Sequence, residues 1–178
     1  FGLILLKFLN KIHKTYKYNF NIYIKPHPNW SNDYPRDSIN SKDRLIYKNL
    51  LKEVDTSSFI FLDSFHKIKD ISKLIDKKNS LIISHHGTVI PEANALGLRT
   101  LSSISGMWSD KYQIGYTFKN VKNLFEQIIN FLEGNLPLID KKESNKNLRK
   151  FIRDYYFSYP SEFESHFNRV IIQYEKKY

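Results

Sequence analysis

The chain has 178 residues, of which 41% are hydrophobic and 15% aromatic, a composition typical of a folded globular domain and not of a disordered chain. It contains no Cys, which excludes a disulfide scaffold, a thiolate metal site and a Cys nucleophile. The net charge of +10 fits either an anionic partner or merely Lys-rich soluble helices, and no zinc-finger spacing or aromatic-interleaved basic run indicates nucleic acid.

The sequence of the first half of the chain predicts helices and short strands, with one long polar loop after the first strand. Apolar residues recur at helical spacing near the start and then alternate, which indicates a helix followed by a strand. Lys25-Pro26-His27-Pro28 ends that strand, because two prolines cannot continue a ladder of hydrogen bonds. The predicted elements are a helix over residues 3–16, a strand over 20–24, a helix over 41–54, a strand over 59–62 and a helix over 68–75.

The centre of the chain predicts a strand, a tight turn, a helix and a second strand. The apolar residues 81–83 are expected to form a buried strand, and residues 84–88 (Ser-His-His-Gly-Thr) are expected to form the turn. The helix covers residues 89–96, and Gly97 stands where a helix end favours a left-handed residue. The chain returns as a strand over residues 99–104, so this βαβ unit predicts a parallel sheet.

The remaining elements complete an α/β chain with a helical tail. They are an extended piece near Tyr116, a helix over residues 121–132, and two helical stretches from residue 145 that break at Tyr159-Pro160. We therefore expect a Rossmann-like parallel sheet flanked by helices over residues 1–140, followed by a helical segment over 141–178. The strands at 20–24 and 81–83 are expected side by side in that sheet, with their carboxyl ends on one side.

The first candidate site follows the first strand. Ligands of open α/β sheets bind beyond the carboxyl ends of the strands, where Lys25 and His27 stand. His27 can donate a hydrogen bond to a phosphate oxygen, and its charge is tunable near neutral pH. A rigid strand-ending loop with a solvated histidine is the alternative reading.

The second candidate site is the 84–88 turn with Glu92. A helix N-terminus offers unpaired N–H groups and partial positive charge to a phosphate, and Gly87 lets the backbone approach it closely. The Thr88 hydroxyl can cap the helix or bind the ligand, and Glu92 can accept hydrogen bonds from ribose or merely complement the helix dipole. The adjacent His85 and His86 are a weak metal signal, so we expect neither a metal nor a cofactor.

These motifs together resemble the C-terminal domain of GT-B glycosyltransferases, in particular the capsule polysaccharide biosynthesis family that includes Kdo transferases. The resemblance covers residues 21–132 and depends on "KPHP" after one strand and "SHHGTVIPEANALGLRT" around the next. It implies a cytoplasmic enzyme, peripheral to the inner membrane, that transfers a sugar such as Kdo from a nucleotide donor. The implied partners are that donor, a glycan or lipid-linked glycan acceptor, and the inner membrane surface.

The resemblance also assigns roles to residues. It implies that His27 contacts the donor phosphate and is the catalytic candidate, and that Glu92 orients the ribose. The residues expected to bind the phosphate are Lys25, His27, Ser84, His85, His86, Gly87 and Thr88.

Two departures from the family pattern leave alternatives open. The turn reads His-His-Gly-Thr instead of Ser-rich, so CDP-glycerol glycerophosphotransferases and UDP-sugar 2-epimerases remain possible relatives. A GT-B enzyme needs two Rossmann-like domains and only one fits this length, so we expect the acceptor domain to precede Phe1 and this chain to show little turnover alone. A non-catalytic interaction domain of the same fold is the third reading.

Overall fold

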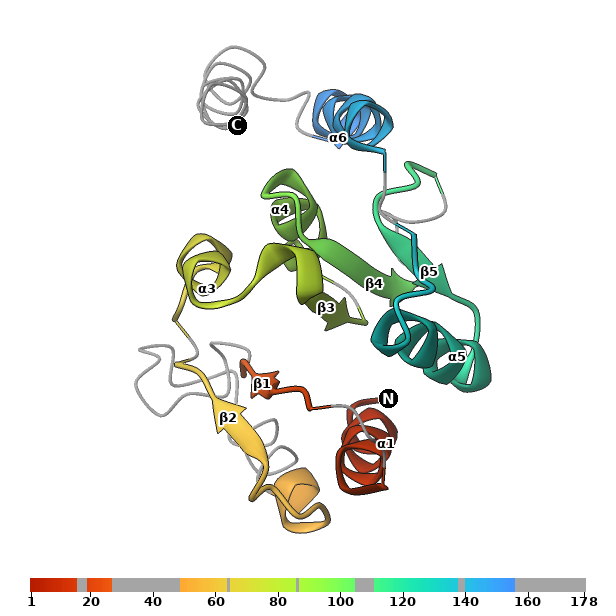
Figure 1. Cartoon of the computed structure of the whole chain (residues 1–178). Helices are drawn as coiled ribbons and strands as arrows, with labels where there is room; N and C mark the ends of the chain where they lie inside the picture. The colour runs from red at the N-terminus through yellow and green to blue at the C-terminus, as the bar shows by residue number, and fades with distance from the viewer. Residues whose placement is uncertain are drawn as a thin grey trace. The chain divides into compact units, whose positions relative to one another are not determined.

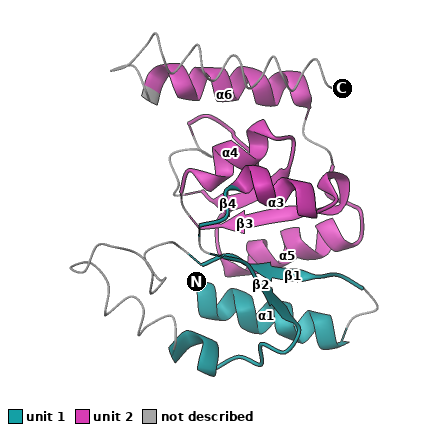
Figure 2. Ribbon diagram, turned by 90° about the vertical axis from the view of Figure 1, so that its left-hand side faces the viewer, with its two compact units in different colours: residues 1–67 teal, residues 68–178 magenta. Residues whose placement is uncertain are grey.

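The chain divides into two compact units in a computed structural model, residues Phe1–Lys67 and Ile68–Tyr178 (Figure 2). The structure describes residues 1–15, 19–26, 49–63, 65–85, 87–104, 111–137 and 140–155. The division falls within the predicted 1–140 domain, and the helix that follows residue 140 belongs to the second unit. The predictions for His27, His86, residues 41–48 and the Tyr159-Pro160 break lie outside the described residues.

The first unit places one long helix against a two-stranded parallel sheet. Helix α1 covers Gly2–Thr15, strand β1 covers Ile22–Ile24 and strand β2 covers Phe59–Phe61; residues 49–52 are also helical. Ile22 is in register with Phe59, and these two side chains are buried with Leu6 and Val54. The helix predicted over 3–16 and the strands predicted over 20–24 and 59–62 are confirmed to within two residues at each end. The helix predicted over 41–54 is seen at residues 49–52 and ends two residues earlier than expected.

The second unit is built around a three-stranded parallel sheet in the order β3-β4-β5 (Figure 1). Its elements, in chain order, are α3 (Ile68–Leu74), the 3₁₀ turn η2 (Lys77–Asn79), β3 (Leu81–Ser84), α4 (Val89–Ala95), β4 (Arg99–Ser103), β5 (Tyr116–Phe118), α5 (Val121–Leu132) and α6 (Lys141–Tyr155). The predicted β3-α4-β4 unit is confirmed, and Gly97 adopts the expected left-handed conformation with φ of 76°.

Helices cover both faces of this sheet, because α4 and α5 lie on opposite sides of it (Figures 1 and 2). The guanidinium of Arg99 lies 5.3 Å from the ring centroid of Phe131, which identifies the face that α5 covers. On the side of α4, helix α6 completes a second hydrophobic cluster. Its buried members are Ile90, Tyr112, Ile114, Leu148, Phe151 and Ile152.

The structure shows the strand pairing within each unit. Strand β1 pairs with β2 in the first unit and strand β3 pairs with β4 in the second, both in parallel. The expectation that β1 and β3 lie side by side joins two different units and stays a prediction. Apolar runs identify strands but carry no information on strand order, which is why the sequence could not settle it. The coarser expectation, a mixed α/β chain with parallel strands flanked by helices, is confirmed.

No helix in the described ranges is both long enough and apolar enough to cross a membrane.

Candidate functional site

The 84–88 turn joins the carboxyl end of β3 to the start of α4. Ser84 is the last residue of β3, and Gly87 adopts a φ of 120°, a left-handed conformation that favours glycine. Apart from the two chain neighbours of Gly87, no described residue has an atom within 4 Å of the position that a Cβ would take there. The backbone of this turn is therefore open on the side where a side chain would otherwise stand.

Thr88 is the N-cap residue of α4, but its hydroxyl does not cap the helix. Its backbone angles are already helical (φ −63°, ψ −16°), and its side chain makes no capping hydrogen bond. An N-cap side chain normally reaches the second or third helical N–H from an extended backbone, which this geometry prevents. Of the two roles that the sequence left open for the Thr88 hydroxyl, capping is therefore excluded.

Glu92 lies one helical turn beyond Thr88. Its backbone N–H donates to the Thr88 carbonyl over 3.1 Å, so the two residues stack along one side of α4. Both are exposed, and neither side chain has a hydrogen-bond partner among the described residues. The pair thus presents a hydroxyl and a carboxylate to solvent beside the turn.

His85 packs against the sheet. Its ring centroid lies 6.5 Å from that of Phe118 on β5, with the ring planes tilted by 52°, and the residue is half-buried. The contact orients the imidazole toward the face of the sheet that carries Phe118. The expectation that His85 and His86 bind the donor phosphate stays a prediction, since His86 lies outside the described residues.

A row of hydroxyls crosses the sheet next to this turn, and the sequence analysis missed it. Ser84, Ser102 and Thr117 occupy the same register position on β3, β4 and β5, and aligned residues of parallel strands point to one face. Ser102 is fully buried and its Oγ has no hydrogen-bond partner among the described residues, as is also true of the Thr100 hydroxyl on the same face. The available signal was the period-two polar pattern of Thr100 and Ser102 within an otherwise buried strand.

Those buried hydroxyls are unusual because a polar group removed from water normally finds a partner. Leaving one unpaired costs about 1–3 kcal/mol. Ser102 lies near the carboxyl end of β4, and Thr100 lies two residues before it. Both hydroxyls are thus close to the edge at which parallel sheets bind ligands.

Lys25 follows β1 in the first unit. It is half-buried, and its Nζ lies 3.4 Å from the carbonyl oxygen of Pro26. Residues of the first and second candidate sites thus belong to different compact units. The expectation that Lys25 and His27 share one site with the 84–88 turn remains a prediction.

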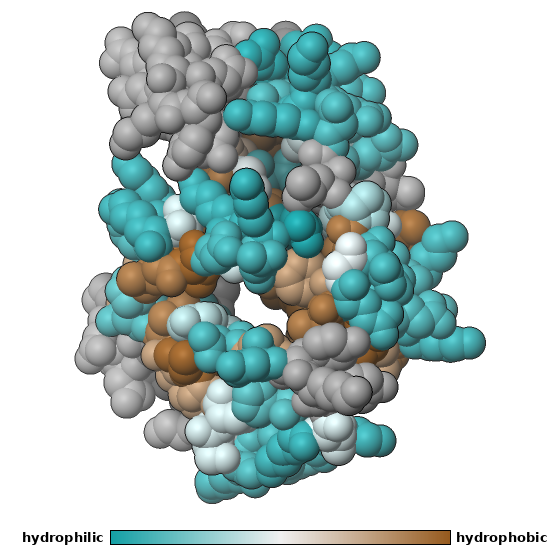
Figure 3. Space-filling view, in the orientation of Figure 1, coloured by the Kyte–Doolittle hydropathy of each residue, from teal (hydrophilic) through white to brown (hydrophobic). Residues whose placement is uncertain are grey.

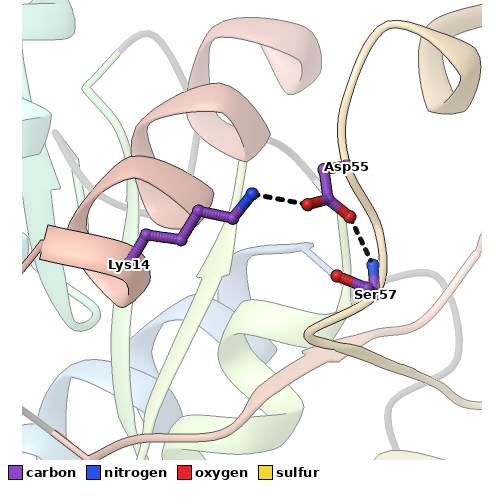
Figure 4. A network of polar contacts seen from close by, with 3 residues as sticks. All are labelled: Lys14, Asp55 and Ser57. Atoms are coloured by element: carbon purple, nitrogen blue, oxygen red, sulfur yellow. Dashed lines mark hydrogen bonds and ion pairs between the residues drawn. The ribbon is translucent and has the colours of Figure 1, made fainter.

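The largest electrostatic perturbation in the described residues is structural and lies in the first unit. Lys14 Nζ donates to the Asp55 carboxylate over 2.5 Å, and the Ser57 N–H donates to its other oxygen over 3.0 Å (Figure 4). The lysine, followed by the Ser57 hydrogen bonds, holds the pKa of Asp55 well below its ordinary range. Asp55 is exposed and ties α1 to the loop before β2, so we assign it no role in binding.

The described residues contain no group of three or more His, Cys, Asp or Glu side chains placed to hold a metal ion. No protein-family model matches the chain, and neither a search of curated proteins nor one of solved structures finds a match.

Proposed function

We propose that the second unit binds the phosphate of a nucleotide-activated sugar, and that the chain is the donor-binding half of a glycosyltransferase of surface-polysaccharide synthesis. One observation carries the proposal: the open, left-handed turn at Gly87, which connects the carboxyl end of a parallel strand to a helix. Phosphates bind at such strand-turn-helix junctions, because several backbone N–H groups converge there without a side chain in the way.

The side chains around the turn support a nucleotide more than a bare phosphate. The Thr88 hydroxyl has no role as a cap and can donate to a phosphate oxygen. Glu92, one turn further on, offers a carboxylate at a place where ribose hydroxyls would need an acceptor. In this proposal the turn binds the charged group and Glu92 selects for the nucleoside.

The chemistry proposed for this half is electrostatic. Transfer of the sugar to an acceptor hydroxyl breaks the bond between the sugar and the donor phosphate, and negative charge builds on the departing nucleotide. N–H donors fixed at that phosphate stabilise the charge as it develops. His27, which the resemblance to the capsule polysaccharide biosynthesis family makes the catalytic candidate, lies outside the described residues, and its contact with the donor phosphate stays a prediction.

A thermal-shift panel of CMP, CDP, UDP, GDP and ADP tests the proposal. A ligand that binds only the folded state stabilises it, by about 2.7 kcal/mol at a concentration one hundred times its Kd. We expect at least one nucleotide to raise the unfolding midpoint, and Gly87→Val to abolish that rise. A preference for CMP favours a Kdo-type donor, whereas CDP or UDP favours the glycerophosphotransferase or epimerase alternatives.

The matched control is Gly134→Val, because Gly134 also has a left-handed φ (75°) and no atom within 4 Å of a Cβ, but lies after α5. This variant also places valine at a positive φ and should retain the response to nucleotide. A panel in which no nucleotide shifts the wild-type midpoint contradicts the proposed function.

A further inference from the structure

The outward face of α6 carries a row of positive charge. Positions 142, 146, 149, 150 and 153 are all Lys or Arg and all exposed. Their spacing places them within one sector of the helix, along about 16 Å at 1.5 Å per residue. We call this set the α6 basic row; its members are Lys142, Lys146, Arg149, Lys150 and Arg153.

Helix α6 packs on the second unit through the side opposite to this row. Leu148 and Phe151 are almost fully buried against α4 and the segment before β5. Ser144 donates a buried hydrogen bond to Asn94 of α4, and the Tyr112 hydroxyl donates to Asp154 over 3.2 Å. The buried and basic residues thus occupy opposite sides of the helix, and Figure 3 shows hydrophilic side chains over α6.

Four of the five members of the row have no acidic partner among the described residues. Within the described residues, Lys142, Lys146, Arg149 and Lys150 form no ion pair, and Arg153 meets only Asp154, over 3.4 Å. Lysines of two other helices differ, since Lys73 pairs with Asp70 and Lys122 with Glu126. Within the row the i,i+4 pairs hold like charges, which destabilises a helix; these pairs are Lys142/Lys146, Lys146/Lys150 and Arg149/Arg153.

We propose that the α6 basic row binds the surface of a membrane rich in anionic phospholipid. Clusters of four to eight Lys or Arg on one face of an amphipathic helix favour such surfaces. The row lies on the convex outside of a helix, which suits an extended flat surface. Single-stranded nucleic acid is instead bound in basic grooves with aromatic stacking platforms, and the row contains no aromatic residue.

This inference is independent of the proposed donor site, because α6 can hold the protein at a membrane whether or not the 84–88 turn binds a nucleotide. A transferase acting on a lipid-linked acceptor would be concentrated near its substrate by such contact.

Vesicle co-sedimentation of the whole chain tests the proposal. We expect binding to phosphatidylcholine vesicles with about a third phosphatidylglycerol, little binding to pure phosphatidylcholine, and release as salt rises well above about 0.15 M. The test variant carries Lys142→Gln, Lys146→Gln, Arg149→Gln and Lys150→Gln. Each basic residue near an anionic surface contributes roughly five-fold, so we expect partitioning to fall by about two orders of magnitude or more.

The control variant removes the same charge elsewhere, through Lys67→Gln, Lys69→Gln, Lys78→Gln and Lys119→Gln, all at exposed positions off α6. It should retain most of the binding. Equal losses in both variants, or tighter retention by single-stranded DNA than by anionic vesicles, would overturn the proposal. If circular dichroism shows that the quadruple α6 variant is unfolded, the double variant Lys142→Gln with Lys146→Gln replaces it. Its partitioning to anionic vesicles should fall by about 25-fold.

Discussion

Gly115 and Gly134 share a left-handed backbone conformation but differ in their surroundings. Both have a φ of 75°, yet a Cβ at Gly115 would lie 2.0 Å from Thr100 Oγ1 and 3.0 Å from the Thr100 carbonyl oxygen, whereas a Cβ at Gly134 meets nothing within 4 Å. Gly115→Ala should therefore cost roughly 2–5 kcal/mol of unfolding free energy, the sum of backbone strain and overpacking.

Gly134→Ala is the control and should cost only the strain, about 1–2 kcal/mol. Denaturant unfolding of both variants gives the comparison. Equal losses would show that Thr100 moves aside and that the approach of β5 to β4 is not tight.

Substitutions at Thr88 and Glu92 should affect two different parts of a bound nucleotide, the phosphate and the ribose. Thr88→Ala should weaken nucleotide binding by about 1–3 kcal/mol, the usual cost of losing a hydrogen bond to a charged group. Glu92→Gln should weaken a nucleoside monophosphate yet leave inorganic phosphate unaffected, because its proposed partner is the ribose. Calorimetry on variants of unchanged thermal stability measures both.

His66→Ala serves as the control, since His66 is exposed and lies outside both motifs. The site assignment fails if Glu92→Gln and His66→Ala leave binding equally unaffected.

Single residues were predictable where local chemistry decides the conformation. Gly97 was expected to be left-handed because a helix ends there, and it is. The failure of Thr88 to cap α4 could not be foreseen, because the residue type permits a cap and only the backbone angles forbid it. The alternating pattern places Thr100 and Ser102 on one face of β4, but the burial of that face depends on contacts with distant segments and could not be predicted from the pattern.

At the scale of elements, the contact between α1 and the loop before β2 predicts a pH dependence. The pKa of Asp55 is depressed in the folded state, so its contribution is present above the unfolded pKa of about 3.9 and is lost as pH falls below it. Lys14→Gln should raise the pKa of Asp55 and make the fall in the thermal midpoint between about pH 5 and pH 2 shallower than in the wild type.

Lys11→Gln is the matched control, because Lys11 is exposed on the same helix and makes no ion pair among the described residues. An NMR titration of the Asp55 carboxyl gives the pKa directly. A curve for Lys14→Gln that overlays the wild type contradicts the assignment of the shift to Lys14.

Helices were predicted well where the cap and the apolar pattern coincide. Helix α5 has the predicted bounds, since the Asn120 side chain accepts from the Asn123 N–H just before the apolar residues begin. Helix α6 begins at Lys141, four residues before the prediction, because Asp140 accepts from the Glu143 N–H ahead of any apolar periodicity. The turn η2 was missed; the side chain of Asp76 stabilises it by accepting from the Lys78 N–H.

At the scale of the whole molecule, the sequence predicted the class of fold but not the assembly of its strands. Each three- to five-residue strand is recognisable from its apolar run, whereas its partner depends on contacts between distant segments. The candidate site follows the same rule. The 84–88 turn is local and was predictable, while its relation to Lys25 depends on how the two units assemble.

The central claim is that the 84–88 turn binds a nucleotide phosphate. Titration of the isotope-labelled chain with the nucleotide that gives the largest thermal shift, followed by amide NMR, tests it most directly. We predict that the largest changes fall on the amides of Gly87, Thr88 and Val89, with smaller ones at Glu92, and that inorganic phosphate reproduces only the former. Changes confined to residues outside this turn, or none at saturating nucleotide, would contradict the account.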